Sequence, residues 1–145
     1  MSTWTGRLVP SGALAGNYYT ASGRLNQVTI VNTQDLDQAW TLNGAMGAFT
    51  VAGGSSSFSG NFLGWSPVVS SVSSAVTGAS TYQMVVTPGA AVDPNAPGLG
   101  AAKPLASSLA GQGLGITTLD ARLKLLIPST AAAGTYTGVL TLSIV

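Results

Sequence analysis

Four aspartates are the carboxylates of this chain, the groups that we consider first for proton transfer or for binding a hard cation. The sequence contains no histidine, glutamate or cysteine. A Ser-His-Asp triad is therefore impossible, and thiolate catalysis and cysteine metal sites are excluded. With so few titratable groups, we expect a protein that is not an enzyme, with no catalytic residue and no cofactor. The carboxylates available are Asp35, Asp37, Asp93 and Asp120.

One group of oxygen-bearing side chains has the spacing of a possible cation site. Asp35 and Asp37 are two residues apart, so in an extended segment their carboxylates point the same way, and Asn32 adds an amide oxygen. The segment lacks the glycine and the distal carboxylate of a calcium-binding loop. We favour a solvated polar turn here and predict no metal site.

Two glycine-rich stretches have some similarity to phosphate-binding loops. They lie at residues 98–100 and 111–115, as Gly-Leu-Gly and Gly-Gln-Gly-Leu-Gly. Neither is followed by Lys-Ser/Thr or by an amphipathic helix, which a phosphate loop requires. We expect both to be loop glycines.

Aromatic rings have a different binding chemistry, because a ring face can stack on the apolar face of a sugar. Alternation along the chain instead directs Trp40 with Leu42, and Trp65 with Leu63, toward a core. Both alternatives stay open at this point. The candidate ligand-binding residues are Trp40, Leu42, Trp65 and Tyr136.

The N-terminal segment has its own aromatic residues. Trp4, Tyr18 and Tyr19 lie in a stretch that is rich in glycine and only weakly periodic. We expect these three side chains to be exposed or to contact another subunit, and they are the candidate assembly residues.

Charge is scarce throughout the chain. Only 6% of the residues are charged and the net charge is +1, whereas an ordinary soluble domain has about 25% charged residues. Hydroxyls and amides must therefore supply the polar surface, and the few cations form no stripe along the sequence, so we expect no nucleic-acid partner. The five cations are Arg7, Arg24, Lys103, Arg122 and Lys124.

Hydrophobic residues are frequent but never continuous. No stretch of 18 residues lacks Ser, Thr, Gly or Asn, so we expect no transmembrane segment. The start Met1-Ser2-Thr3 fits an initiator placed before a trimmed product, and we expect a secreted chain in its mature form.

Period-two alternation dominates the chain and predicts short strands. It is clearest from residue 135 to the C-terminus, where Tyr136, Leu140 and Leu142 share one face, and in residues 122–127 just before it. We expect these two strands to form a hairpin through residues 129–134. Further strands are predicted over residues 25–32, 38–42, 48–52, 60–66, 68–76 and 82–87.

Residues 88–115 contain several Pro and Gly turn signals and no sustained period. We predict one long Pro/Gly-rich loop here, with a short helical turn possible at residues 105–110. A chain of 145 residues can bury roughly 70% of the surface that it exposes when unfolded. The prediction is an all-β, single-domain β-sandwich of the Ig-like, Greek-key type.

Several phrases occur along the chain in a fixed order: VTIVNT (28–33), AWTL (39–42), GAFT (47–50), LGWSP (63–67), LKLLIP (123–128) and AGTYTGVLTL (133–142). Together they resemble the WxL-type domains of Gram-positive secreted proteins, especially their actinobacterial relatives. The resemblance covers residues 25–145 and leaves residues 1–24 outside as an N-terminal segment, extended or engaged with a neighbouring subunit. The first Trp-x-Leu is Trp40-Thr41-Leu42, whereas the last strand has Leu142-Ser143-Ile144 in place of a second one.

The resemblance implies a β-sandwich at the cell surface that attaches non-covalently to the cell wall, with peptidoglycan as the ligand. The alternative is a structural subunit that polymerises into an extracellular fibre or lattice, because sheet edges without charge are templates for pairing with another chain. The expected partners are thus a wall glycan or copies of the chain itself. Both hypotheses place the chain outside the cell, secreted or associated with the wall.

Overall fold

The structure is a computed structural model in which residues 9–15, 18–34, 36–76, 78 and 81–145 are described, the first of these ranges by its backbone alone. The described residues form strands and one short 3-10 helix, without an α-helix. Within these ranges there is no helix with the length and hydropathy needed to cross a membrane. The predicted all-β sandwich is confirmed.

The larger sheet is built around its longest strand, β10. All pairings in it are antiparallel: β7 lies along one edge of β10, β2 and then β3 follow the other edge, and β1 pairs with β2. We call this the β10 sheet. Its strands are β1 (Val9–Ala15), β2 (Tyr18–Arg24), β3 (Val28–Asn32), β7 (Leu63–Ser74) and β10 (Gly115–Pro128).

A β-bulge separates β2 from β3. Arg24 lies opposite Arg122, and Val28 lies opposite Leu119. The four residue steps from Arg24 to Val28 therefore match three steps along β10, so one extra residue lies between β2 and β3. Because of the bulge, Ala21 and Leu25 on one side and Val28 on the other all turn toward the core.

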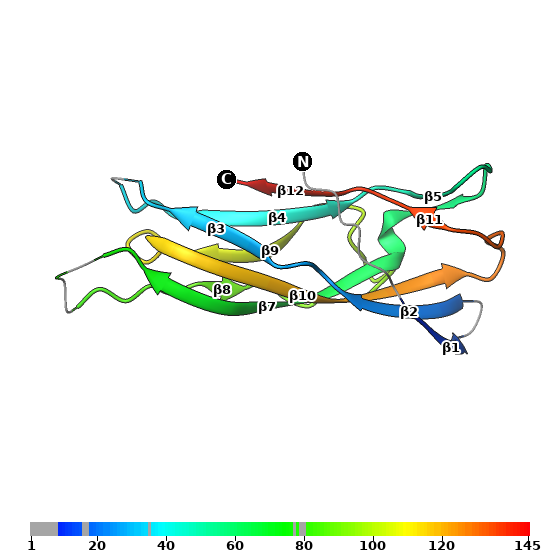
Figure 1. Cartoon of the computed structure of the whole chain (residues 1–145), viewed down its shortest axis with the longest axis horizontal. Coiled ribbons are helices and arrows are strands. Elements are labelled where there is room, and N and C mark those ends of the chain that lie inside the picture. The colour runs from blue at the N-terminus through cyan, green and yellow to red at the C-terminus, as the bar shows by residue number, and fades with distance from the viewer. Residues whose placement is uncertain (1–8, 16–17, 35, 77, 79–80) are drawn as a thin grey trace.

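The second main sheet, the β4 sheet, has the order β12-β4-β9-β8. A small sheet of β11, β5 and β6 extends the molecule at one end, on the right of Figure 1. In that view β3 and β12 lie along the same upper long side, and β7 and β8 along the lower side. The remaining elements are β4 (Trp40–Met46), β5 (Phe49–Val51), β6 (Ser57–Phe58), the 3-10 helix η1 (Gly60–Phe62), β8 (Thr87–Pro88), β9 (Lys103–Ser108), β11 (Tyr136–Thr137) and β12 (Leu140–Ile144).

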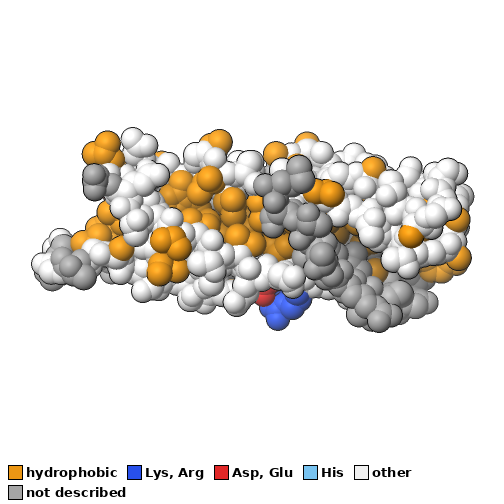
Figure 2. Space-filling model, turned by 45° about the horizontal axis from the view of Figure 1, so that its top comes forward, with side chains coloured by type: hydrophobic (Ala, Val, Ile, Leu, Met, Phe, Trp, Pro, Cys, Tyr) orange, Lys and Arg blue, Asp and Glu red, His pale blue; other side chains and the backbone are white. Residues whose placement is uncertain are grey.

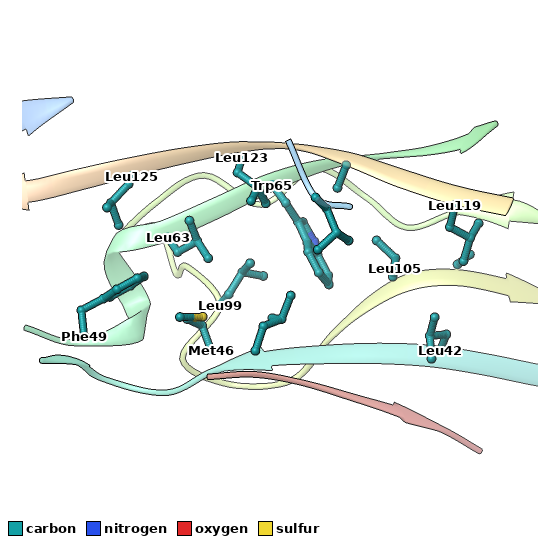
Figure 3. Packing of buried hydrophobic residues seen from close by; sticks show 14 of the residues in the cluster. Leu42, Met46, Phe49, Leu63, Trp65, Leu99, Leu105, Leu119, Leu123 and Leu125 are labelled. Carbon is teal, nitrogen blue, oxygen red and sulfur yellow. The ribbon is translucent and has the colours of Figure 1, made fainter. Parts of the chain in front are cut away.

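The core lies between the two main sheets (Figure 3). Trp65 of β7 is its largest fully buried side chain. The indole projects toward Gly44 of β4, where a β-carbon would come within 2.5 Å of the ring atom Cη2 of Trp65. A glycine in the middle of β4 thus leaves the space that the tryptophan fills, as close packing between sheets requires.

The predicted hairpin between residues 122–127 and the C-terminal strand is wrong. β10 and β12 belong to different sheets, and β12 pairs with β4 instead. The reason is that both edges of β10 are already taken, one by β7 and the other by β2 and β3. The connection through residues 129–135 therefore leads from β10 to β11 of the small sheet, and β12 of the β4 sheet follows.

The single long loop predicted over residues 88–115 is also wrong, because this interval contains β9, which lies between β4 and β8. Of the residues predicted as a helical turn, 105–110, the first four belong to β9 instead. Leu105 and Ala106 are fully buried in it, so tertiary burial outweighs the turn signals around them. Three other strand predictions change. Residues 60–66 and 68–76 form η1 followed by one strand, β7, and of residues 82–87 only Thr87 belongs to a strand.

The remaining part of that loop, residues 89–102, packs against both sheets. Leu99 is fully buried, its N–H donates to the Leu63 carbonyl at 2.9 Å, and its own carbonyl accepts from Met46 N–H at 2.6 Å. Leu63 begins β7 and Met46 ends β4. This one residue therefore links the two sheets through its backbone and fills the core with its side chain.

We expect Leu99→Ala to lower the free energy of unfolding by about 2–5 kcal/mol, because it leaves a cavity at a fully buried site. Leu109→Ala is the matched control, since Leu109 is also a loop leucine but is 70% exposed. That control should change the free energy of unfolding by less than about 0.5 kcal/mol. Urea unfolding followed by tryptophan fluorescence measures both, and equal effects would contradict the packing described for this loop.

Candidate functional site

The structure places three of the four candidate ligand-binding residues inside the core. Trp40 and Leu42 are each 6% exposed and Trp65 is 2% exposed. Alternation predicts this inward placement. Because the two indole rings are buried, neither ring face is open to a sugar. The fourth, Tyr136, is half-buried beside Phe58, and its hydroxyl donates to the Ala132 carbonyl at 2.8 Å. A binding role for these residues stays a prediction that would require the sandwich to open.

Among the candidate assembly residues that the structure describes, Tyr19 has an exposed side chain, at 49%. Tyr18 is half-buried, with its ring centroid 5.5 Å from that of Phe62. Trp4 lies outside the described residues. Both tyrosines belong to β2, which pairs with β10, so the β10 sheet already begins within the segment that the family resemblance leaves out.

The aspartates that the structure describes serve the fold. Asp37 accepts hydrogen bonds from the Tyr82 hydroxyl at 2.7 Å and from Gly113 N–H at 3.0 Å. The Asp120 carboxylate lies 3.3 Å from the Arg24 guanidinium and accepts a hydrogen bond from the backbone N–H of Ala121. Asp93 is exposed, and Asp35 lies outside the described residues.

No group of three or more potential metal ligands occurs within the described ranges. The Asn32 side-chain oxygen accepts from Gln34 N–H at 3.3 Å, and its amide donates to the Gly113 carbonyl at 3.0 Å. Together with the contacts of Asp37, these bonds tie the 111–115 glycine stretch to the chain between β3 and β4. The polar turn and the loop glycines are thus one structural network at this end of the sandwich.

Tyr82 completes that network. Its hydroxyl donates to Asp37 and accepts from Leu114 N–H at 2.9 Å. Burial raises the pKa of the Tyr82 hydroxyl above its ordinary value of 10.0, and the hydrogen bond to Asp37 and that carboxylate's charge raise it further, although the bond from Leu114 opposes them. The protonated phenol is therefore the form that the folded state favours.

The most distinctive surface feature is a group of cations on the outer face of the β10 sheet. Arg122 of β10 lies directly opposite Arg24 of β2, and Lys124 is two residues further along the same face of β10. All three side chains are exposed. We call these three residues the cationic face. Sequence reasoning took the five cations as scattered, and only the strand register shows that three of them are neighbours.

One carboxylate lies beside the cationic face. Asp120 is two residues before Arg122 on β10 and pairs with Arg24, whose side chain is 64% exposed whereas that of Asp120 is 15% exposed. The carboxylate reduces the repulsion between the opposed arginines. Figure 2 shows a single blue and red group at the lower edge of the molecule, on a side that is otherwise uncharged.

The comparisons with known proteins add no relative: no family model matches the chain, and no curated protein or solved structure shows significant similarity to it.

We expect Tyr82→Phe to lower the free energy of unfolding by about 1–3 kcal/mol at neutral pH, because it removes one hydrogen bond and leaves Leu114 N–H and an Asp37 oxygen without this partner. Tyr19→Phe, at an exposed ring, is the control and should leave stability within about 0.5 kcal/mol. Thermal and urea unfolding measure both. Equal stability of the two variants would contradict a structural role for the network.

The same group predicts an alkaline dependence. Since the pKa of Tyr82 is raised in the folded state, its contribution to stability is fully present below its ordinary value of 10.0 and is lost as the pH rises through the higher folded value. Tyr82→Phe should therefore lose less stability than the wild type between about pH 9 and about pH 12. Urea midpoints measured across that range test the sign, and a steeper loss in the variant would refute it.

Proposed function

We propose that the chain is a non-catalytic, secreted domain of the bacterial cell surface that associates non-covalently with the cell wall through the cationic face. Two observations support the proposal. The ordered sequence phrases resemble wall-attached domains, and three cations gather on one exposed sheet face of a molecule with few other charges. The second observation carries the proposal, because it supplies a surface on which attachment can occur.

The spacing of the cationic face suits a polymer with repeated anionic groups. Neighbouring strands are about 4.8 Å apart, and residues two apart on one strand are separated by about 7 Å. Arg24, Arg122 and Lys124 therefore present positive groups along both directions of the sheet. Ser22 lies opposite Lys124 and Ser66 opposite Arg122, so hydroxyl donors flank the cations. Peptidoglycan offers carboxylates to the cations and hydroxyls to the serines.

The absence of catalysis in the proposal follows from the chemistry of the described carboxylates. Asp37 and Asp120 are engaged in hydrogen bonds or an ion pair, and Asp93 is exposed with no histidine anywhere in the chain to act with it. A general acid or base needs a group whose pKa is tuned toward neutrality and which is held against a substrate. The proposed domain works by contact alone.

Retention on purified, insoluble peptidoglycan tests the proposal. We expect the double variant Arg122→Ser, Lys124→Ser to bind about twofold to thirtyfold more weakly, because each of the two exposed charge pairs contributes roughly 0.2–1 kcal/mol. Raising the salt concentration should weaken wild-type binding in the same direction, since exposed charges are screened.

Lys103→Ser is the matched control, because Lys103 is a cation of the other sheet, on β9, and its loss also lowers the net charge. It should retain wild-type binding. Circular dichroism checks that all variants keep the β fold. The proposal fails if the wild type is retained no better than an unrelated β-sandwich of equal charge, or if the control and the double variant weaken binding equally.

A second candidate function, self-assembly into a fibre or lattice, is favoured by the sheet edges. β12 carries no charged residue, and neither does β7 from Ser66 to Ser74. Within the described residues, β12 pairs only with β4. In the same part of the chain, β7 pairs with β10 and otherwise forms one isolated bridge, between Trp65 and Val92. Uncharged open edges are templates for adding a strand from another copy.

We expect Ser143→Lys, which places a charge on the β12 edge, to reduce any concentration-dependent association of the chain. Thr130→Lys adds the same charge in an exposed turn and is the control. Sedimentation velocity and electron microscopy at rising concentration measure the effect. A wild type that stays monomeric at every concentration would remove this candidate.

A further inference from the structure

Two arginines of the cationic face lie directly opposite each other on neighbouring strands. Arg24 of β2 is in register with Arg122 of β10, and both side chains are exposed on the outer face of the β10 sheet. The β-carbons of such a pair are about 4.5–5.5 Å apart, and like charges in this position are destabilising. The chain has only five cations. Placing two of them together breaks a local rule of sheet stability, which proteins do chiefly at functional sites.

Asp120 anchors one of the two arginines. Its Oδ1 accepts a hydrogen bond from Ala121 N–H at 2.7 Å, and its Oδ2 lies 3.3 Å from Nη2 of Arg24. Because each oxygen of this carboxylate has its own partner, the carboxylate is held in place and restricts the long Arg24 side chain in turn. Among the described residues, neither Arg122 nor Lys124 takes part in an ion pair.

The charge changes sign along this part of β10. Asp120, Arg122 and Lys124 follow one another at intervals of two residues on the outer face, which separates neighbours by about 7 Å. An approaching anion is therefore repelled at the Asp120 end and attracted at the Lys124 end. The favourable position for an anion is beside the arginine pair, on its Lys124 side, where the exposed Ser22 lies opposite Lys124.

Building on the wall association proposed above, we propose that Arg24 and Arg122 together bind one carboxylate of the wall polymer. Lys124 lies beside this carboxylate, and Asp120 is the positioning residue that holds the Arg24 guanidinium. An ionised carboxylate has two oxygens with about four lone-pair sites, so it can accept hydrogen bonds from two guanidinium groups at once. A carboxylate between the two arginines also removes their mutual repulsion.

The planar fork of arginine distinguishes this arrangement from attraction by charge alone. A guanidinium matches the geometry of a carboxylate with two parallel hydrogen bonds, whereas an ammonium group is a compact point charge. If the fork is used, replacing either arginine by lysine removes recognition without changing the charge of the face.

Retention on purified, insoluble peptidoglycan by the variants Arg24→Lys and Arg122→Lys tests this step. We expect each variant to bind about twofold to fivefold more weakly than the wild type, because the charge is conserved and the fork is lost. Retention of both variants at the wild-type level would overturn the joint binding by two arginines. It would leave the wall association itself standing.

The role of Asp120 has a test whose sign is decisive. Asp120→Ala and Asp93→Ala each remove one carboxylate and raise the net charge by the same amount, and Asp93 lies exposed in the 89–102 loop, away from the cationic face. Attraction by charge alone predicts that Asp120→Ala binds more tightly. We expect it to bind about twofold or more weakly instead, because Arg24 loses its anchor.

Two further variants complete this comparison. Asp120→Glu keeps a carboxylate and should recover part of the binding, whereas the control Asp93→Ala should stay within about 1.5-fold of the wild type, since distant exposed charges are screened. Circular dichroism and urea unfolding check that each variant keeps the fold. Tighter binding by Asp120→Ala than by Asp93→Ala would overturn the positioning role.

Chemical modification of the polymer identifies the group that is bound. Peptidoglycan whose carboxyl groups have been converted to amides should retain much less wild-type protein, and the differences between the wild type and the lysine variants should disappear. Undiminished retention would overturn a carboxylate as the ligand.

Labelled, soluble poly-glutamate separates this proposal from the wall association. Fluorescence anisotropy should show binding by the wild type and about twofold to fivefold weaker binding by Arg122→Lys. If this result is obtained while the wild type is not retained on peptidoglycan, the wall association is refuted and carboxylate binding by the arginine pair stands. A wild type that binds neither polymer refutes both.

Discussion

The packing of Trp65 into the space left by Gly44 sets the distance between the two sheets. Any side chain at position 44 would overlap the indole, and any smaller residue at position 65 would leave a cavity at the centre of the core. The two residues come from different sheets, β4 and β7, so this contact aligns the layers. Leu99 strengthens the alignment, because its backbone bonds to β7 and to β4 at once.

This core has a direct consequence for function. The aromatic residues with the best chemistry for stacking on a sugar, Trp40 and Trp65, are used to hold the sheets together. The loop of residues 89–102, which has enough length to reach a polymer, is used to link them. The binding that we propose therefore uses the outer faces of the sheets, where three cations are neighbours.

Some of the few charged and titratable groups stabilise the fold, and others lie exposed on the surface. Asp37 and Tyr82 hold the loops at one end of the sandwich, and Asp120 of β10 pairs with Arg24 of β2. Among the described cations, Arg122 and Lys124 are exposed and lie beside the Arg24–Asp120 pair, and the proposed attraction of an anionic partner rests on this group. A surface with so little other charge lets even a small cationic face dominate the local potential.

Alternation in the sequence determined which segments are strands and which side of each strand is apolar. It predicted β3, β4, β5 and β12 in nearly the right places and sent Trp40, Trp65 and Leu140 into the core. A strand period reports only the local face of the chain, since it depends on residues i and i+2. It therefore predicted several strands and the all-β class, but not β1, β2 or β9, and not which strands pair.

Tertiary structure alone decided the pairing of the strands. It separated residues 122–127 from the C-terminal strand, made β9 out of a segment full of turn residues, and brought Arg24 beside Arg122. These outcomes depend on which strand edges are still free and on which side chains fill the space between two sheets, and both are properties of the whole packed molecule. For the same reason the cationic face appears only when residues far apart in the sequence are placed next to each other.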